Sequence, residues 1–204
     1  MEQPQTSKNA VSSEMQADVR EIVISSEEIQ RRVREIGKQI SNDYVYKNPL
    51  LVGVLKGVLF FMADLLRAID IPVTVDFIAV SNYSAEARNQ GIVHLAKDLE
   101  TPLAGRHVIF IEDVIDTGLT LNYLLRNLRA RQPASLEVCV LFNKPEHRLI
   151  NIPLKYKGFD LPDRFVVGYG LDYQEKYRNL PYIGLLDARV LKEHTENEKS
   201  RGPK

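Results

Sequence analysis

A short stretch in the middle of the chain combines three carboxylates, two threonines and a glycine. It follows an apolar run and reads Val108-Ile109-Phe110-Ile111-Glu112-Asp113-Val114-Ile115-Asp116-Thr117-Gly118-Leu119-Thr120. Continuous apolar residues are typical of a strand buried on both faces, so the pattern predicts a strand followed by acids and by a turn that begins a helix. Backbone N–H groups and the helix dipole at such a turn favour a dianion, and threonine hydroxyls add donors. Residues 116–120 are therefore a candidate site for a phosphate monoester.

The two acids before this turn, Glu112 and Asp113, restrict what the phosphate can belong to. Unpaired carboxylates repel a polyphosphate unless they bind sugar hydroxyls or neutralise a divalent cation. A phosphorylated sugar bound with Mg²⁺ meets both conditions. The alternative is an ordinary capped helix start, where Asp and Thr are common. A cap needs one acceptor, whereas three acids behind a buried strand are costly without a ligand, so the stretch favours a ligand site.

Two other phosphate-binding motifs can be compared directly with the sequence. The pattern G-x-x-x-x-G-K-[ST] does not occur, and the G-x-G at Gly168-Tyr169-Gly170 continues without a third glycine. Both absences argue against nucleoside triphosphate hydrolysis by a P-loop and against dinucleotide binding of the Rossmann type.

The elements around the acidic stretch alternate between strands and helices. Ser25 and Glu28 have the spacing of a capping box and precede apolar residues at helical intervals, which predicts a helix. Strands joined by helical crossovers form a mainly parallel sheet with helices on both faces and ligands at the carboxyl ends of its strands, so the fold class is α/β. The predicted strands are residues 50–54, 73–80, 108–111 and 136–142, with helices at 58–69 and 120–131 and further strands at 165–167 and 182–186 in a smaller appended layer.

Composition predicts one domain that lies outside the membrane. The 204 residues, 44% of them apolar, suffice for one core, predicted over residues 18–191 with disordered segments at 1–17 and 192–204. Lysine plus arginine (27) equals aspartate plus glutamate (27), so no overall field attracts nucleic acid or an anionic membrane. The single Cys139 excludes an internal disulfide, and no signal-like or membrane-spanning run is present, which predicts a cytoplasmic protein.

The acidic stretch resembles the phosphoribosyl-diphosphate signature of type I phosphoribosyltransferases, and the resemblance extends from about Val19 to Leu186. It includes, in the same order as in the family, the blocks Leu55-Lys56-Gly57, Ser81-Asn82-Tyr83, Asn143-Lys144-Pro145 and Asp163 to Tyr173, followed by Arg178. The resemblance implies a parallel-sheet domain with a small hood and a flexible lid. It also implies transfer of 5-phosphoribosyl from phosphoribosyl diphosphate to hypoxanthine or guanine, which yields IMP or GMP and diphosphate.

The resemblance also implies roles on the side of the phosphoribosyl donor. Glu112 and Asp113 hold the ribose hydroxyls and the magnesium environment, and the turn Asp116-Thr117-Gly118-Leu119-Thr120 holds the 5-phosphate. Lys56, Gly57 and Arg178 bind diphosphate, and the peptide bond before the lysine is cis in the family. Taken alone, Lys56 would be an exposed turn residue and Arg178 an ordinary surface arginine.

On the side of the base, the resemblance makes Asp116 the carboxylate that accepts the proton from N7 of the purine. Lys144 donates to the 6-oxo group, Phe165 stacks on the ring and Val166 offers backbone contacts. Asp172 lies near a second magnesium, so the implied metal residues are Glu112, Asp113 and Asp172. The implied lid spans residues 81–97 and includes Asn82 and Tyr83, and the implied assembly is a homodimer or homotetramer.

The sequence departs from the family pattern at two positions. Leu119 stands where some relatives carry a lysine in the phosphate turn, and Asn82 replaces the residue that usually precedes the lid tyrosine. Two alternatives compete with the 6-oxopurine transferase. One is a regulatory, RNA-binding module on the same fold, against which Asp116 and the zero net charge argue. The other is a transferase for xanthine, adenine or a pyrimidine, against which the pair Lys144 and Phe165 argues.

Overall fold

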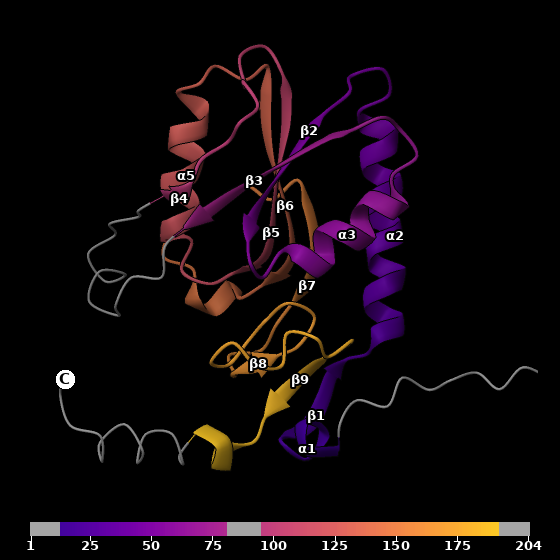
Figure 1. Cartoon of the computed structure of the whole chain (residues 1–204), viewed down its shortest axis with the longest axis vertical. Helices are drawn as coiled ribbons and strands as arrows, with labels where there is room; N and C mark the ends of the chain where they lie inside the picture. The colour runs from indigo at the N-terminus through magenta and orange to yellow at the C-terminus, as the bar shows by residue number, and fades with distance from the viewer. Residues whose placement is uncertain (1–12, 81–94, 192–204) are drawn as a thin grey trace, which may run out of the picture.

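The computed structural model describes residues 13–80 and 95–191, which form two sheets (Figure 1). The larger sheet has six strands in the order β4-β3-β2-β5-β6-β7, and the smaller has three in the order β1-β9-β8. In the larger sheet β3, β2, β5, β6 and β7 run parallel, while β4 pairs antiparallel with β3. The predicted α/β class, with a mainly parallel sheet and a smaller appended layer, is confirmed.

The elements follow one another along the chain in the order that the sequence pattern predicts, with several short additions. Their bounds are α1 Ser13–Ala17, β1 Val19–Ile24, α2 Ser26–Asp43, β2 Leu50–Leu55, α3 Leu59–Ala68, β3 Thr74–Val80, β4 Leu95–Lys97, β5 His107–Ile115, α5 Leu119–Arg129, β6 Ser135–Asn143, the 3₁₀ helix η1 Pro145–His147, β7 Tyr156–Asp160, β8 Val166–Val167 and β9 Ile183–Leu186.

Helix α2 begins at the predicted capping box. The Ser25 side chain accepts a hydrogen bond from the Glu28 backbone N–H, and the Glu28 carboxylate accepts from the Ser25 backbone N–H. These two bonds satisfy donors that a helix start otherwise leaves without partners. The apolar stripe that follows is buried and directs α2 against the sheet.

The large sheet has a core on each face. Helices α2 and α3 cover one face and α5 covers the other (Figure 1). Successive side chains of a strand point to opposite faces, so along β5 Ile109 and Ile111 pack with α2 and α3, whereas Val108 and Phe110 pack with α5. All four are fully buried. Each such side chain contributes about 1.5–3 kcal/mol on burial, which holds the carboxyl end of β5 in a fixed position.

The small sheet forms a hood at the end of the large one. Strand β1 pairs with β9, and β9 pairs with β8, all antiparallel. In Figure 1 this hood lies below the large sheet, beyond the tip of the β2 arrow. The chain between β8 and β9 therefore lies close to the carboxyl ends of the parallel strands, where ligands are expected.

Several boundaries differ from the sequence predictions. The buried strand was predicted to end at Ile111, but β5 continues to Ile115 because its ladder with β6 extends to the pair Ile115 and Asn143. Glu112 and Asp113 therefore belong to the strand itself. The pattern also missed β7, whose sequence YKGFD lacks a continuous apolar run, and β1. Helix α1 lies within residues 1–17, the predicted amino-terminal extension.

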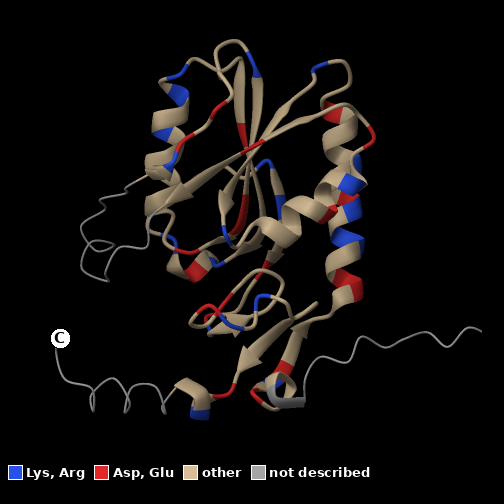
Figure 2. Ribbon diagram, in the orientation of Figure 1, with Lys and Arg blue, Asp and Glu red and all other residues tan. Residues whose placement is uncertain are grey.

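Charged residues of both signs are spread over the described surface. Figure 2 shows acidic and basic positions mixed along α2 and close together between the large sheet and the hood. Within residues 13–80 and 95–191, no helix is both long enough and apolar enough to cross a bilayer.

Candidate active site

The turn between β5 and α5 forms a cavity at a helix start. Gly118 caps α5 with a φ of 83°, a left-handed conformation that glycine adopts without strain. The α-helical hydrogen bonds begin with Asn122 N–H donating to the Gly118 carbonyl, so the amides of the first helical turn precede them. We call the cavity of about 210 Å³ at this turn the turn cavity; it is lined by Glu112, Val114, Ile115, Asp116, Thr117, Gly118, Thr120 and Leu121.

The turn is held from outside by the segment that follows β6. The Leu149 N–H donates to the Thr117 carbonyl at 3.0 Å, and the Lys144 N–H donates to the Ile115 carbonyl at 2.9 Å. The Leu119 N–H lies 3.4 Å from the Thr117 hydroxyl. These contacts hold Thr117, Gly118 and Thr120, which line the turn cavity, at the start of α5, an arrangement suited to a phosphate.

Glu112 and Asp113, predicted to act together, lie on opposite faces of β5. Glu112 lines the turn cavity, whereas Asp113 lines a second cavity that faces the hood. Both residues are half-buried, and desolvation of their carboxyl groups raises the pKa of Asp113 to about 6 and that of Glu112 well above its usual range. Glu112 Oε2 has no hydrogen-bond partner among the described residues. An orphaned buried acceptor is costly, as expected where a ligand hydroxyl or a cation supplies the partner.

The second cavity, of about 220 Å³, brings together residues that lie far apart in the sequence. We call it the hood cavity; it is lined by Asp113, Val114, Asp116, Lys144, Val166, Leu171, Asp172 and Arg178. Asp116 lines both cavities, so the two adjoin at this carboxylate. The predicted residues for ribose, diphosphate and purine thus meet at one place, between the carboxyl end of β5 and the hood.

The Lys56-Gly57 loop closes one side of the site. The Leu55–Lys56 peptide bond is cis, as the family resemblance implied. A Cβ added at Gly57 would lie 1.8 Å from Asp113 Oδ2, and one added at Gly170 would lie 2.1 Å from the Gly57 carbonyl oxygen. The loop therefore packs directly against Asp113 on one side and the hood on the other, and only glycine fits at either contact.

The two basic residues predicted to bind diphosphate, Lys56 and Arg178, both form ion pairs with the carboxylate of Glu175. Lys56 Nζ lies 2.9 Å from Glu175 Oε2, and Arg178 Nη2 lies 3.2 Å from Oε1 and 2.7 Å from Asp172 Oδ1. The hydrogen bond from Lys56, and then the charge of Arg178, lower the pKa of Glu175. Arg178 Nε is buried and has no hydrogen-bond partner among the described residues. An anionic ligand such as diphosphate could therefore share these two basic side chains with Glu175.

Of the predicted purine residues, Lys144, Val166 and Asp172 line the hood cavity, and Phe165 directly precedes Val166 in the chain. The Lys144 ammonium donates to the Arg164 carbonyl at 3.3 Å, which places it beside the segment that carries Phe165. Phe165 is 45% exposed, and its ring meets the edge of Tyr173 with centroids 5.4 Å apart. A large aromatic face left this open beside a polar cavity is suited to stacking on a planar ligand. Val166 is buried next to it.

Sequence reasoning missed two residues of the site, His147 and Glu175. His147 Nδ1 lies 2.6 Å from Asp116 Oδ1, and its Nε2 is hydrogen-bonded to Asp163. The sequence did carry one signal for His147, which follows the predicted site residue Lys144 by three positions. A titratable side chain at that spacing can lie close to the same site. Glu175 similarly lies between Asp172 and Arg178 in the sequence.

Two predictions about the site, the metal-binding residues and the lid, stay predictions. Within residues 13–80 and 95–191, no three His, Cys, Asp or Glu side chains are close enough to hold a metal ion on their own, so Glu112, Asp113 and Asp172 do not form a single cluster. The reason is that Glu112 and Asp113 are adjacent on a strand and point to opposite faces. The predicted lid residues Asn82 and Tyr83 lie outside the described residues.

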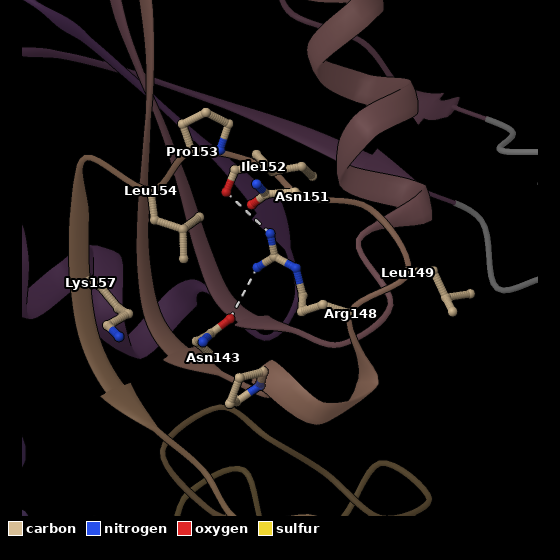
Figure 3. Close-up of a pocket in the computed structure, with 9 residues that line it drawn as sticks. Asn143, Arg148, Leu149, Asn151, Ile152, Pro153, Leu154 and Lys157 are labelled. Atoms are coloured by element: carbon tan, nitrogen blue, oxygen red, sulfur yellow. Dashed lines mark hydrogen bonds between the residues drawn. The ribbon is translucent and has the colours of Figure 1, made fainter.

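A larger cavity of about 630 Å³ is lined by residues between Asn143 and Lys157 rather than by the predicted site residues (Figure 3). Arg148 points into it and is bonded to the Asn143 side chain and to the carbonyls of Ile150 and Ile152. Because its guanidinium already donates hydrogen bonds to protein oxygens, Arg148 stabilises the loop between η1 and β7 and has few donors left for a ligand.

Comparison with known proteins places this geometry in a family. The phosphoribosyl transferase domain model matches residues 23–174. The chain is 48% identical over 179 residues to the hypoxanthine-guanine phosphoribosyltransferase of Mycobacterium bovis, covering 85% of this chain and 89% of that protein. It is likewise 48% identical to the Streptococcus agalactiae enzyme of the same name, over 86% of this chain and 98% of that protein.

A solved structure gives the same result for the fold. The crystal structure of a hypoxanthine phosphoribosyltransferase from Staphylococcus aureus superposes with a TM-score of 0.85 at 42% sequence identity, covering 89% of this chain and 98% of that one. The resemblance predicted from the sequence blocks is therefore confirmed. The chain belongs to the phosphoribosyltransferase family, among its hypoxanthine-guanine members.

Proposed function

We propose that the chain transfers 5-phosphoribosyl from phosphoribosyl diphosphate to hypoxanthine or guanine, giving IMP or GMP and diphosphate. The observation that supports this most directly is the hood cavity, in which carboxylates, a lysine and an arginine from separate segments surround one space beside the turn cavity. A phosphorylated sugar that spans the two cavities would place its reacting carbon near Asp116, which borders both.

The donor would lie with its 5-phosphate in the turn cavity. The first-turn amides of α5 and the hydroxyls of Thr117 and Thr120 would hold that phosphate, and Leu119 would contribute only its backbone N–H. Lys56 and Arg178 would bind the diphosphate, the arginine through a rigid guanidinium fork that matches paired phosphate oxygens. The unpartnered Arg178 Nε supports this assignment.

Magnesium fits the donor set of this site as a substrate-bound ion. Mg²⁺ characteristically uses one or two carboxylates together with substrate phosphate oxygens, which agrees with the lack of a three-ligand cluster in the described residues. We assign Asp113 and Asp172 as the carboxylates beside the cation and the orphaned Glu112 as a partner for ribose hydroxyls. When bound, the cation would neutralise charge that develops on the departing diphosphate.

In the reaction, the bond between the anomeric carbon and the diphosphate oxygen breaks and a bond to purine N9 forms. The anomeric carbon gains oxocarbenium character as the leaving group departs, so the nearby carboxylates stabilise it. The purine loses its N7 proton to Asp116, whose carboxylate becomes a neutral acid until product release. The open face of Phe165 would stack on the purine, and Lys144 would donate to its 6-oxo group.

A panel of bases tests the substrate assignment. With Mg²⁺ and phosphoribosyl diphosphate, we expect the protein to convert hypoxanthine and guanine with kcat/KM at least about 10²-fold above that for adenine, because the 6-amino group of adenine cannot accept a hydrogen bond from Lys144. Formation of each nucleotide is followed by ultraviolet absorbance. Equal or faster turnover of adenine would contradict the assignment.

The variant Glu175→Gln tests whether Lys56 and Arg178 bind diphosphate. The Glu175 carboxylate competes with diphosphate for Lys56 and Arg178. The neutral amide of glutamine competes less, so Glu175→Gln should bind inorganic diphosphate about 2- to 10-fold more tightly, a range that follows from the modest strength of exposed ion pairs. Calorimetry with magnesium diphosphate measures this. Glu35→Gln, which removes the partner of Arg32 on α2, is the matched control. Unchanged or weaker binding by Glu175→Gln would argue against these roles for Lys56 and Arg178.

A further inference from the structure

His147 lies between two carboxylates that belong to different parts of the site. Its Nδ1 is 2.6 Å from Oδ1 of Asp116, in the phosphate turn, and its Nε2 is hydrogen-bonded to Asp163, which precedes the purine residue Phe165. The ring is 35% exposed. We call this arrangement the carboxylate bridge; it joins the turn after β5 to the segment before β8 through one imidazole on η1.

The geometry of the bridge suits an imidazolium, the protonated form of the ring. A neutral imidazole carries one N–H and can donate to one acceptor, whereas here both ring nitrogens face carboxylate oxygens. The hydrogen bond to Asp116, and then the one to Asp163, raise the pKa of His147 above its usual value. Other charged residues nearby in its segment are Glu146 and Arg148, and Arg148 is bonded to carbonyl and amide oxygens on the far side of η1.

The backbone that carries His147 is fixed on both sides. The Lys144 N–H is bonded to the Ile115 carbonyl before η1, and the Leu149 N–H is bonded to the Thr117 carbonyl after it. Arg148 adds bonds to Asn143, Ile150 and Ile152. The His147 side chain therefore has little conformational freedom. It can fix the orientation of Asp116, whose side chain is 57% exposed.

We propose that His147 is a positioning residue of the transfer reaction. By occupying Oδ1 of Asp116 it leaves Oδ2 to face purine N7, and by binding Asp163 it keeps the purine segment docked against the phosphate turn. This inference rests on the proposed role of Asp116 as the base. It assigns His147 no contact with the substrate, since its effect passes through the two carboxylates.

Kinetics of His147→Gln provide the first test. Glutamine can donate to one carboxylate but cannot bridge two as a cation, so kcat should fall about 10-fold, and KM for hypoxanthine should rise while KM for phosphoribosyl diphosphate stays within about 2-fold. Asp163→Asn should give the same pattern. His107→Gln is the control, because His107 also forms a hydrogen bond, to Ser135, at the distant start of β5. Unchanged kcat and purine KM in His147→Gln would overturn the proposal.

The pH dependence separates positioning from a merely structural role. A raised pKa means that the bridge is complete at low pH and is lost as pH rises through that pKa. The wild-type enzyme should therefore lose kcat on the alkaline side, and His147→Gln should lack this limb. In an Asp116→Asn background, His147→Gln should lower kcat by less than it does in the wild type, because of the two links only the one to Asp163 is left intact. An additive loss in the double variant would contradict the proposal.

A measurement without activity keeps this inference distinct from the proposed function. In NMR titrations of the intact protein, the His147 imidazole should have a pKa above the ordinary value of histidine, and Asp116→Asn or Asp163→Asn should lower it. If the pKa of His147 does not respond to either substitution, the bridge does not exist in solution. If the bridge is present but the wild-type protein transfers no phosphoribosyl group, the proposed function fails instead.

Discussion

Asp116→Asn is expected to lower kcat about 10²- to 10⁴-fold, the range typical of removing a general base. The amide has nearly the shape of the carboxylate and can still accept a hydrogen bond from His147, but it cannot take the N7 proton. Asp116 lines both cavities, so its loss should act on the chemical step more than on binding. Single-turnover rates with saturating donor and hypoxanthine measure this effect directly.

The control for this variant is Asp98→Asn. Asp98 is exposed, is ion-paired among the described residues with Arg131 and lines neither the turn cavity nor the hood cavity, so its loss should leave kcat unchanged. Donor binding to Asp116→Asn, measured by calorimetry, should stay within a few-fold of the wild type. A kcat for Asp116→Asn within 2-fold of the wild type would remove the proton-transfer role from this residue.

Gly57→Ala is expected to lower kcat/KM for phosphoribosyl diphosphate by about 10²-fold. The new methyl group would lie 1.8 Å from Asp113 Oδ2, and the other side of the loop is blocked by the close approach of Gly170 to the Gly57 carbonyl. Either Asp113 or the Lys56-Gly57 loop must move by an ångström or more, and displacements of that size at a reacting centre cost about two orders of magnitude in rate. Initial rates over a range of donor concentrations measure the loss.

The matched control adds a methyl group where no atom is near. A Cβ at Gly105 would have nothing within 4 Å, although its φ of 72° makes alanine strained there. Gly105→Ala should therefore lower the free energy of unfolding by about 1 kcal/mol and leave the rate unchanged. If Gly57→Ala retained full activity, the loop would not be packed against Asp113 in the working enzyme.

Local patterns were sufficient for the elements that carry the site. The capping box at Ser25 and Glu28 depends on side chains three residues apart, and it occurs as predicted. The alternation of apolar strands and helices predicted the parallel sheet, because crossover connections leave few other topologies. The turn before α5 was also recognisable, since Gly118 lies between two threonines directly after the acidic strand end.

Contacts between distant segments were not predictable in the same way. The end of β5 was predicted too early because the acids interrupt the apolar run, whereas pairing with β6 carries the strand to Ile115. The separation of Glu112 from Asp113 follows from that extension, because residues within a strand alternate between its faces.

What the sequence determined by itself is therefore the fold class, the order of the predicted strands and helices and the position of the turn between β5 and α5, each of which depends on residues close together in the chain. Only the tertiary structure decided that His147 bridges Asp116 and Asp163, and that Glu175 pairs with both Lys56 and Arg178. These contacts join segments that approach each other only after the hood has packed against the end of the sheet. The physical reason is that side-chain electrostatics act over a few ångströms in space, whatever the separation along the chain.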